Sequence, residues 1–157
     1  MTEVRIVPAR PEDIPAMIAL LEELFSIEQD FVPDLSRQAK GLALLLQEHA
    51  RAKVQVARDA TGQVVGMVSA HLVISTAEGA PSAWIEDVIV APHARGDGIG
   101  RSLLEAVLRW ASEQGATRAQ LLVDLGNAPA LGFYQHLGWQ QTHLGVRRIH
   151  LAKQKNP

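Results

Sequence analysis

A glycine-rich loop followed directly by a helical pattern is the part of this sequence best suited to bind an anion. The loop, Arg95 to Gly100, follows a strand-like run from Trp84 to Val90. Glycines allow backbone turns with positive φ and let a ligand approach the N–H groups closely. The unpaired N–H groups and the positive dipole end of such a helix start stabilise a phosphate. The sequence therefore predicts a phosphate site between Arg95 and Arg101, two cations that flank the loop.

Two adjacent carboxylates, Glu86 and Asp87, lie within the apolar strand that precedes this loop. Buried carboxylates are costly unless they are paired or functional, so both are candidates for a general base. Strand alternation places the two on opposite faces of the sheet. The face of Glu86 is expected to hold Trp84, Val88 and Val90. The face of Asp87 is expected to hold Ile85 and Ile89.

The elements that must position these residues follow from the hydrophobic periodicity. Strands are expected at residues 3–8, 53–58, 63–74, 84–90 and 119–125, and two last strands at 140–144 and 146–151. Helices are expected at 11–27, 35–49, 99–114 and 130–136, and a loop at 75–82. The unit from 84 to 125 is a strand–helix–strand crossover, which implies a parallel strand pair, whereas 53–74 is typical of an antiparallel hairpin. The sequence thus predicts an α/β fold with a mixed sheet of about seven strands and four helices.

Length and composition limit the function classes. The 157 residues are expected to form one domain, 1–157, with a polar tail from about residue 152. The net charge of −2 does not favour a nucleic-acid partner. The chain has no cysteine and its six histidines lack ligand spacing, so no metal site is expected. No apolar stretch approaches the roughly 20 residues that span a membrane, and no secretory signal layout is present. The expected location is the cytoplasm.

Two motifs about 30 residues apart resemble those of the GNAT superfamily of acyl-CoA-dependent N-acyltransferases. The first motif consists of Val88, Val90, Pro92, Arg95, Gly96, Gly98, Ile99 and Gly100. The second consists of Asn127, Ala130, Phe133, Tyr134, Gly138 and Trp139. The resemblance covers nearly the whole chain, since the order of strands and helices also matches. Trp139 departs from the pattern, because the family more often has phenylalanine there.

The resemblance implies that acetyl-CoA binds in a V-shaped gap where the fourth and fifth strands splay apart. The backbones of Val88, Ile89 and Val90 would bind the pantetheine arm, and the N–H groups from Gly96 to Arg101 would bind the pyrophosphate. The Asp97 side chain is expected to face solvent while its N–H group serves the phosphate. The donor-binding set implied in this way comprises Val88, Ile89, Val90, Arg95, Gly96, Asp97, Gly98, Ile99, Gly100, Arg101, Ser102, Asn127, Ala130, Phe133 and Tyr134.

The resemblance also implies the chemistry, which is direct attack of an amine on the thioester within a ternary complex. Glu86 is the first candidate for the base that removes a proton from the amine, and Asp87 is the alternative. Asp124 is a third acidic candidate. Tyr134, the only tyrosine in the chain, falls at the general-acid position of the family. The string Ile85-Glu86-Asp87 looks like a segment of glucosamine-phosphate and polyamine acetyltransferases in this superfamily.

The acceptor is expected to be a primary amine of a small molecule. Residues expected to touch it are Glu28, Phe31, Glu86 and Asp124, with Asp30 as a further candidate. Two other interpretations remain open: acetylation of a protein or peptide amine, and a regulatory module that binds acyl-CoA without turnover. A homodimer is expected by analogy with the family alone.

Overall fold

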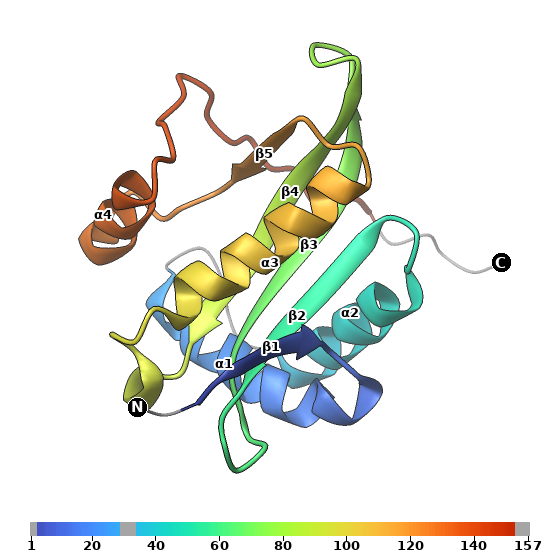
Figure 1. The fold of residues 1–157 in the computed structure, drawn as a ribbon. Helices are drawn as coiled ribbons and strands as arrows, with labels where there is room; N and C mark the ends of the chain where they lie inside the picture. Colours follow the sequence, from blue (N-terminus) through green and yellow to red (C-terminus); the bar gives the residue numbers. More distant parts are fainter. Residues whose placement is uncertain (1–2, 29–33, 153–157) are drawn as a thin grey trace, which may run out of the picture.

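A computed structural model of the chain describes residues 3–28 and 34–152. Its sheet has five strands in the order β1-β2-β3-β4-β5 (Figure 1). Their bounds are Arg5–Pro8 (β1), Ala52–Arg58 (β2), Val64–Ser75 (β3), Ala80–Val90 (β4) and Arg118–Leu121 (β5). Neighbouring strands from β1 to β4 are antiparallel, and β4 and β5 are parallel. The predicted hairpin and the predicted parallel pair are both confirmed.

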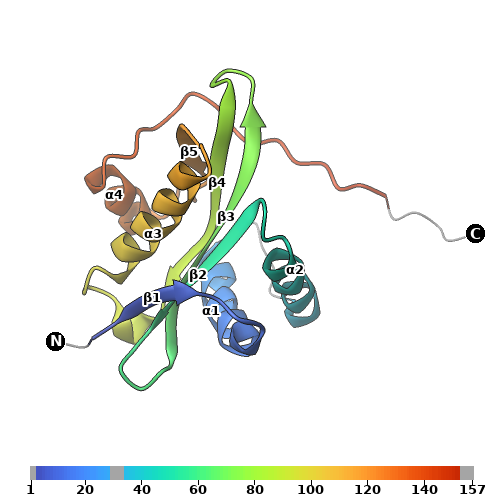
Figure 2. The ribbon, with the colours of Figure 1, turned by 45° about the vertical axis from the view of Figure 1, so that its right-hand side comes forward.

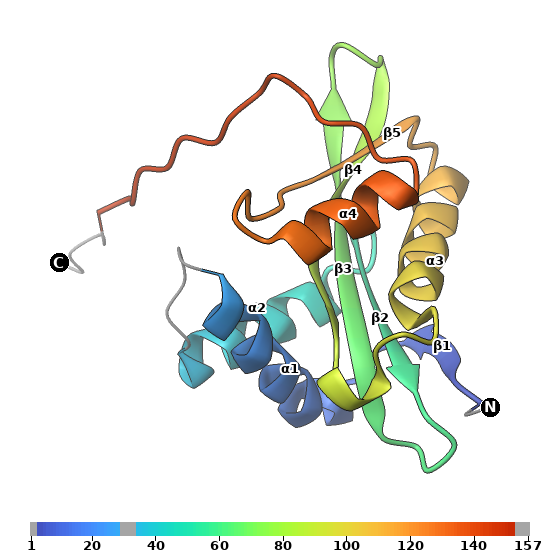
Figure 3. The same ribbon diagram turned by 90° about the vertical axis from the view of Figure 1, so that its left-hand side faces the viewer.

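Helices cover both faces of this sheet. Their bounds are Ile14–Ile27 (α1), Leu35–Gln47 (α2), Ile99–Glu113 (α3) and Ala128–His136 (α4), with short 3-10 turns at Pro11–Asp13 (η1) and Pro92–Ala94 (η2). The helices α1 and α2 lie on one side of the sheet and α3 on the other (Figures 2 and 3). The four predicted helices are therefore present, each within two residues of the expected ends, apart from the single turn η1 that precedes α1. No described helix is long and apolar enough to cross a membrane.

The helix that follows the glycine-rich loop packs tightly on the middle of the sheet. Leu103, Leu104 and Val107 of α3 are buried, as their helical spacing predicts. Gly66 of β3 lies directly beneath this helix. A Cβ atom built on Gly66 would lie 3.0 Å from Cδ1 of Leu103 and 3.3 Å from the carbonyl oxygen of Ile89. The absence of a side chain at Gly66 therefore permits the close approach of α3 to β3.

Replacing Gly66 by alanine is expected to lower the free energy of unfolding by about 1–3 kcal/mol, because the methyl group overpacks a filled core. Urea unfolding of the variant measures this change. The matched control is Gly41→Ala in α2, where a Cβ would meet no atom within 4 Å. That control is expected to be stabilised by about 0.5–1 kcal/mol, since glycine disfavours a helix interior. Equal effects of the two substitutions would contradict the packing argument.

A bulge in β4 changes which side chains share a face. Met67 of β3 pairs with Ile89 and Ser69 pairs with Glu86, so β4 contains one residue more than β3 over this stretch. Partner residues across an antiparallel pair lie on the same face of the sheet. Glu86 therefore lies on the face of Ser69, whereas Val90 pairs with Gly66 on the face of α3.

The simple alternation predicted for this strand is consequently wrong. Glu86 and Val90 were expected on one face and lie on opposite faces, because the extra residue inverts the alternation between them. Asp87 was expected opposite Glu86, yet its Oδ2 lies 3.0 Å from the Ser69 hydroxyl, on the same side as Glu86. Asp87 is itself the bulged residue, with a φ of 56°.

Three other expectations fail at element ends. No strand is assigned after β5 in the described residues, so the sheet has five strands and not seven. Residues 140–152 are instead exposed and without regular structure. The connection expected to be a loop from 75 to 82 is a shorter turn, because β3 extends to Ser75 and β4 begins at Ala80. The strand β5 ends at Leu121, four residues before the expected end, where its pairing with β4 stops.

Candidate active site

An open edge of β4 lies between the fourth and fifth strands. The strand β5 pairs with β4 only from Ser82 to Ile85. Among the described residues, β4 has no strand partner on its β5 side from Glu86 to Val90. Backbone groups on such an edge must find other partners. The expected splay of the two strands is thus confirmed, and the gap begins at the predicted acidic pair.

The loop after β4 presents unpaired donors. Gly96 and Gly98 have φ values of 92° and 79°, which only glycine adopts without strain. In the described part of the chain, no atom accepts a hydrogen bond from the backbone N–H groups of residues 96–101. The first bond of the helix turn is donated by the Ser102 N–H group to the carbonyl of Gly98, at 3.1 Å. The geometry therefore leaves a cluster of N–H groups at the positive end of α3, as an anion site requires.

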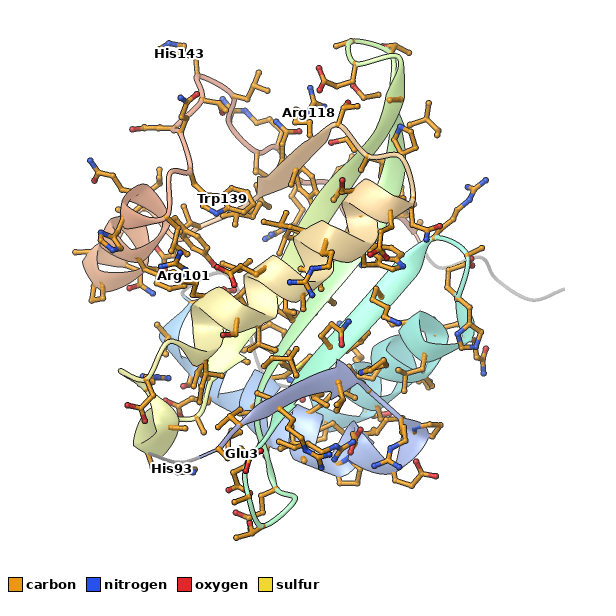
Figure 4. The ribbon with its side chains drawn as sticks, in the orientation of Figure 1. Glu3, His93, Arg101, Arg118, Trp139 and His143 are labelled. Atoms are coloured by element: carbon orange, nitrogen blue, oxygen red, sulfur yellow. The ribbon has the colours of Figure 1, made fainter. Side chains whose placement is uncertain are left out.

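The two flanking arginines are already paired within the chain. Arg95 donates from Nε to the carbonyl oxygen of Val90 at 2.9 Å, and its Nη2 lies 3.7 Å from Oε1 of Glu23. These contacts tie the loop to the end of β4 and to α1. Arg101 donates from Nε to Oε1 of Glu105 at 2.9 Å, one turn along α3. Figure 4 shows Arg101 at the first turn of α3, on the side toward α4.

The other residues predicted to form the donor-binding loop differ in their exposure to solvent. The Asp97 side chain is exposed, as expected, and Ser102 is exposed next to the unpaired N–H groups. Ile99 is buried and anchors the first turn of α3 in the core. A Cβ built on Gly100 would lie 3.2 Å from Cζ of Phe133. The first turn of α3 therefore packs directly against the ring of Phe133 in α4.

The segment between β5 and α4 is fixed by two short side chains. Asn127 caps α4, because its Oδ1 accepts a hydrogen bond from the Ala130 N–H group at 3.1 Å. This bond uses the amide oxygen of Asn127 and leaves the amide N–H groups for another acceptor. Asp124 accepts a hydrogen bond from the Gly126 N–H group at 2.8 Å, which holds the turn before α4. Both residues were expected near the ligands, and both position the helix that carries Tyr134.

Tyr134 lies among aromatic rings. Its ring centroid is 5.1 Å from that of Phe133 and 6.0 Å from that of Trp139, both in edge-to-face contact. Burial, with a smaller contribution from the charge of Glu28, raises the pKa of Tyr134 to about 12. The hydroxyl therefore stays protonated at neutral pH. The effect of Glu28 also places the C-terminal end of α1 close enough to Tyr134 to influence it.

The carboxylate of Asp87 sits in an unusual environment. Asp87 is the sole non-glycine residue with positive φ among the described residues. The hydroxyl of Ser69 lies 3.0 Å from Oδ2 of Asp87 and 3.2 Å from the carbonyl oxygen of Glu86. Burial, and next the charge of Glu86, raise the pKa of Asp87 to about 6, against the opposing effects of the Ser69 hydrogen bond and of His71. The side chain is therefore poised to gain or lose a proton near neutral pH.

Glu86 is the exposed member of the acidic pair. Its Oε1 accepts a hydrogen bond from the indole N–H group of Trp84 at 3.0 Å. Ser69, which holds Asp87, was not identified from the sequence. The available signal was a hydroxyl inside the apolar run of β3, because a fully buried hydroxyl needs a hydrogen-bond partner.

Asp30 and Phe31, which were expected to contact the acceptor substrate, lie outside the described residues. Glu28 is described and half-buried at the end of α1. The described residues contain no group of three or more histidine, aspartate or glutamate side chains that could hold a metal ion. The site as a whole combines an open strand edge, a loop with unpaired N–H groups, an acidic pair and a half-buried tyrosine.

The chain is similar in sequence to known acetyltransferases. Residues 16–139 match the Acetyltransferase (GNAT) family. The aminoalkylphosphonate N-acetyltransferase of Salmonella typhimurium is 30% identical over 135 residues, which is 86% of this chain and 84% of that protein. The aminoglycoside N(6')-acetyltransferase type 1 of the same species is 25% identical over 113 residues, or 70% of this chain and 76% of that protein.

The fold comparison agrees with the sequence comparison. A solved structure of an aminoglycoside N-acetyltransferase in complex with CoA superposes with a TM-score of 0.80, at 17% identity, over 97% of both chains. The unpaired N–H groups of the loop and the open edge of β4 fit a CoA donor in this chain. The chain belongs to the GNAT family and is an N-acetyltransferase whose donor is acetyl-CoA.

Proposed function

We propose that this enzyme acetylates the primary amine of a small cationic molecule by direct attack within a ternary complex. The observation that carries the proposal is the bulge of β4, which sets a partly buried carboxylate with a raised pKa beside an open strand edge. A small amine is supported by the two Salmonella relatives, whose names specify small amines. A cationic acceptor is supported by the carboxylates of Glu28, Glu86 and Asp87 around the site.

The donor would be held by the backbone more than by side chains. The unpaired N–H groups of residues 96–101 would bind the pyrophosphate, with the Ser102 hydroxyl beside them. The open edge at Val88 and Ile89 would bind the amides of the pantetheine arm. The Val90 carbonyl already accepts a hydrogen bond from Arg95, so this arginine would act by fixing the end of the strand.

Bound acetyl-CoA supplies a thioester carbonyl for attack and a thiolate leaving group. Asp87 would accept the proton of the amine, either directly or through a water molecule, since a base is most effective when its pKa lies near the operating pH. Glu86 would keep the pKa of Asp87 raised and attract the cationic amine. Tyr134 would hold a proton at its hydroxyl oxygen for the leaving sulfur. The chain has no cysteine, which agrees with transfer that needs no thiol on the enzyme.

The test is a panel of amines incubated with acetyl-CoA, with the released CoA thiol as the readout. We expect turnover with small polyamines, aminoalkyl compounds or amino sugars, and lines that intersect in initial-rate plots against both substrates. Turnover with peptide amines alone would overturn the small-molecule acceptor. Parallel lines, which indicate a covalent acyl-enzyme, would overturn direct transfer. We place the reaction in the cytoplasm, where acetyl-CoA is available.

Replacing Gly98 by alanine is expected to raise the KM for acetyl-CoA about tenfold or more. The αL conformation strains an alanine by about 1–2 kcal/mol, so the loop relaxes and its N–H groups turn away from the pyrophosphate. The matched control is Gly62→Ala, which has a φ of 86° in the turn between β2 and β3. Both variants should lose similar stability in thermal unfolding, and only Gly98→Ala should change the KM. A raised KM for acetyl-CoA in both variants would show that backbone strain, and not the position of the loop N–H groups, causes the increase.

A further inference from the structure

The hydroxyl group of Ser69 in β3 faces two acceptors and has one proton to donate. Its oxygen lies 3.0 Å from Oδ2 of Asp87 and 3.2 Å from the carbonyl oxygen of Glu86. Ser69 is 0% exposed, so its hydroxyl depends on partners inside the protein. A serine hydroxyl donates one hydrogen bond at a time. It can therefore serve the carboxylate or the carbonyl, and a change at either acceptor can move it to the other.

The bulge of β4 creates this arrangement. Ser69 is paired with Glu86, and β4 has one residue more than β3 directly beyond this pair. Asp87 has a φ of 56°, and its carboxylate lies against the Ser69 hydroxyl. In a regular strand, the side chains of residues 86 and 87 point to opposite faces, so one hydroxyl on β3 would not reach the carboxylate of residue 87. The same extra residue thus brings the hydroxyl, the carbonyl and the carboxylate together.

The proton state of Asp87 decides which of the two acceptors is stronger. An ionised carboxylate accepts a charge-assisted hydrogen bond, which is roughly twice as strong as a neutral one, so the Ser69 hydroxyl then donates to Oδ2. A protonated carboxyl group has lost this charge and is a weaker acceptor than a peptide carbonyl. The hydroxyl then turns to the carbonyl of Glu86 by rotation about one side-chain bond.

Charges on the neighbouring elements keep both proton states of Asp87 accessible. Burial and the charge of Glu86 on β4 raise its pKa, whereas the serine hydrogen bond and His71 on β3 lower it, and the result is a pKa of about 6. Glu28 on α1 and Tyr134 on α4 are the other titratable groups placed at the site, and the charge of Glu28 acts on Tyr134. A carboxyl group with this pKa exchanges its proton near neutral pH, so both hydrogen-bond arrangements are populated.

We propose that Ser69 is a positioning residue for Asp87, and that its hydroxyl exchanges acceptors when Asp87 gains or loses a proton. The proposal rests on the function proposed above, in which Asp87 takes a proton from the acceptor amine. While Asp87 is ionised, Ser69 donates to Oδ2 and leaves Oδ1 to take that proton. Once Asp87 is protonated, Ser69 donates to the Glu86 carbonyl. Asp87 then releases the proton to solvent, and Ser69 returns to Oδ2.

Titration followed by carbon NMR tests the exchange without any substrate. In the native protein the carboxyl signal of Asp87 should titrate near pH 6, and the backbone carbonyl signal of Glu86 should move with the same midpoint. In Ser69→Ala the Asp87 midpoint should rise by about one pH unit, because the ionised carboxylate loses its donor. The movement of the Glu86 signal should largely disappear. Asp87→Asn identifies the Asp87 signal by its loss.

Steady-state kinetics with the best amine test the role in the reaction. In Ser69→Ala the acid limb of kcat/KM should move upward by the same amount as the NMR midpoint. The value of kcat on the plateau should fall about tenfold, since the carboxylate is no longer held in place, while the KM for acetyl-CoA stays unchanged. Ser69→Cys keeps a weaker donor and should give a midpoint between those of serine and alanine, an order that a packing role would not produce.

The matched control is Ser82→Ala in β4. Ser82 is 1% exposed, and its hydroxyl donates to the carbonyl oxygen of Arg118 at 3.3 Å, away from the acidic pair. This variant should lose about as much thermal stability as Ser69→Ala and leave the acid limb where it is. An equal movement of the limb in Ser82→Ala would make the effect a general consequence of lost packing and would overturn the proposal.

The NMR and kinetic results fail in different ways. An unchanged Asp87 midpoint in Ser69→Ala, or a Glu86 carbonyl signal that still moves fully, overturns the exchange even if Asp87→Asn is inactive. Native kcat in Asp87→Asn overturns the proposed base instead. A raised NMR midpoint in Ser69→Ala without any movement of the acid limb would show that Asp87 is not the base, and the positioning role would be overturned with it.

Discussion

Asp87→Asn should yield a protein that is more stable at neutral pH and nearly inactive. The ionised carboxylate of Asp87 is destabilising, because its pKa in the folded state, about 6, exceeds the ordinary value of 3.8. Its contribution to stability is therefore fully present below pH 3.8 and is lost as the pH rises through 6. A shift of this size corresponds to roughly 3 kcal/mol at pH 7. Asparagine also tolerates the positive φ of this position, so the backbone should not resist the change.

Urea unfolding at pH 7.5 and pH 4 measures this effect. The gain of Asp87→Asn over the native protein should approach 1–3 kcal/mol at the higher pH and largely disappear at the lower. The exposed Glu113→Gln serves as the control and should change stability by less than about 0.5 kcal/mol at both. A loss of stability in Asp87→Asn at pH 7.5 would show that the ionised carboxylate is needed by the fold.

Activity measurements on the same variant distinguish the two carboxylates. If Asp87 is the base, Asp87→Asn lowers kcat about 10²–10⁴-fold. The kcat/KM of the native enzyme should fall as the pH drops below about 6, since Asp87 then binds a proton. Glu86→Gln should move that acid limb to lower pH while keeping most of kcat, because the charge of Glu86 raises the pKa of Asp87. A large loss of kcat in Glu86→Gln, with little in Asp87→Asn, would instead assign the base to Glu86.

Tyr134→Phe should lower kcat about 10²-fold or more while the KM for acetyl-CoA changes little. The substitution removes the hydroxyl and keeps the ring contacts with Phe133 and Trp139. Because burial raises the pKa of Tyr134 to about 12, the native enzyme should show no alkaline loss of activity from this group below about pH 11. Steady-state kinetics with the best amine measure both parameters.

The control for Tyr134 is Trp139→Phe, which alters packing around the same ring without touching its hydroxyl. It should reduce thermal stability more than kcat, because a smaller ring leaves a gap beside α4. If Tyr134→Phe keeps native kcat, another group or solvent protonates the leaving sulfur. If both variants lose kcat equally, the loss reflects the position of α4 and not proton transfer.

Local patterns were enough to predict the glycine-rich loop, the helix α3 and the parallel pair of β4 and β5. The loop glycines, the helix after them and the parallel strand pair all depend on residues close in sequence. The spacing of Leu103, Leu104 and Val107 identified the buried face of α3 correctly. The gap between β4 and β5 followed from the family resemblance, and the structure has it at the expected place.

The placement of the acidic pair, Glu86 and Asp87, could not be predicted from local patterns. The bulge at Asp87 depends on how β4 is aligned with β3, which involves Ser69, a residue distant in sequence. The alternation of side chains along β4 alone does not indicate that β4 has one residue more than its partner strand β3 over this stretch. The two strands expected at the C-terminus are absent because residues 140–152 pair with no strand of the described chain, and a short run of residues does not by itself supply a neighbouring strand.

The contact between Gly100 and Phe133 links two events that are usually considered separately. Gly100 belongs to the turn that would receive the pyrophosphate, and Phe133 precedes the tyrosine that would protonate the sulfur. A ligand that orders the first turn of α3 therefore also stabilises α4, and thermodynamic reciprocity requires that ordering α4 tighten the hold on the nucleotide by the same factor. The product, free CoA, keeps its pyrophosphate and so retains this benefit. The coupling that helps acetyl-CoA to bind should therefore also oppose the dissociation of CoA.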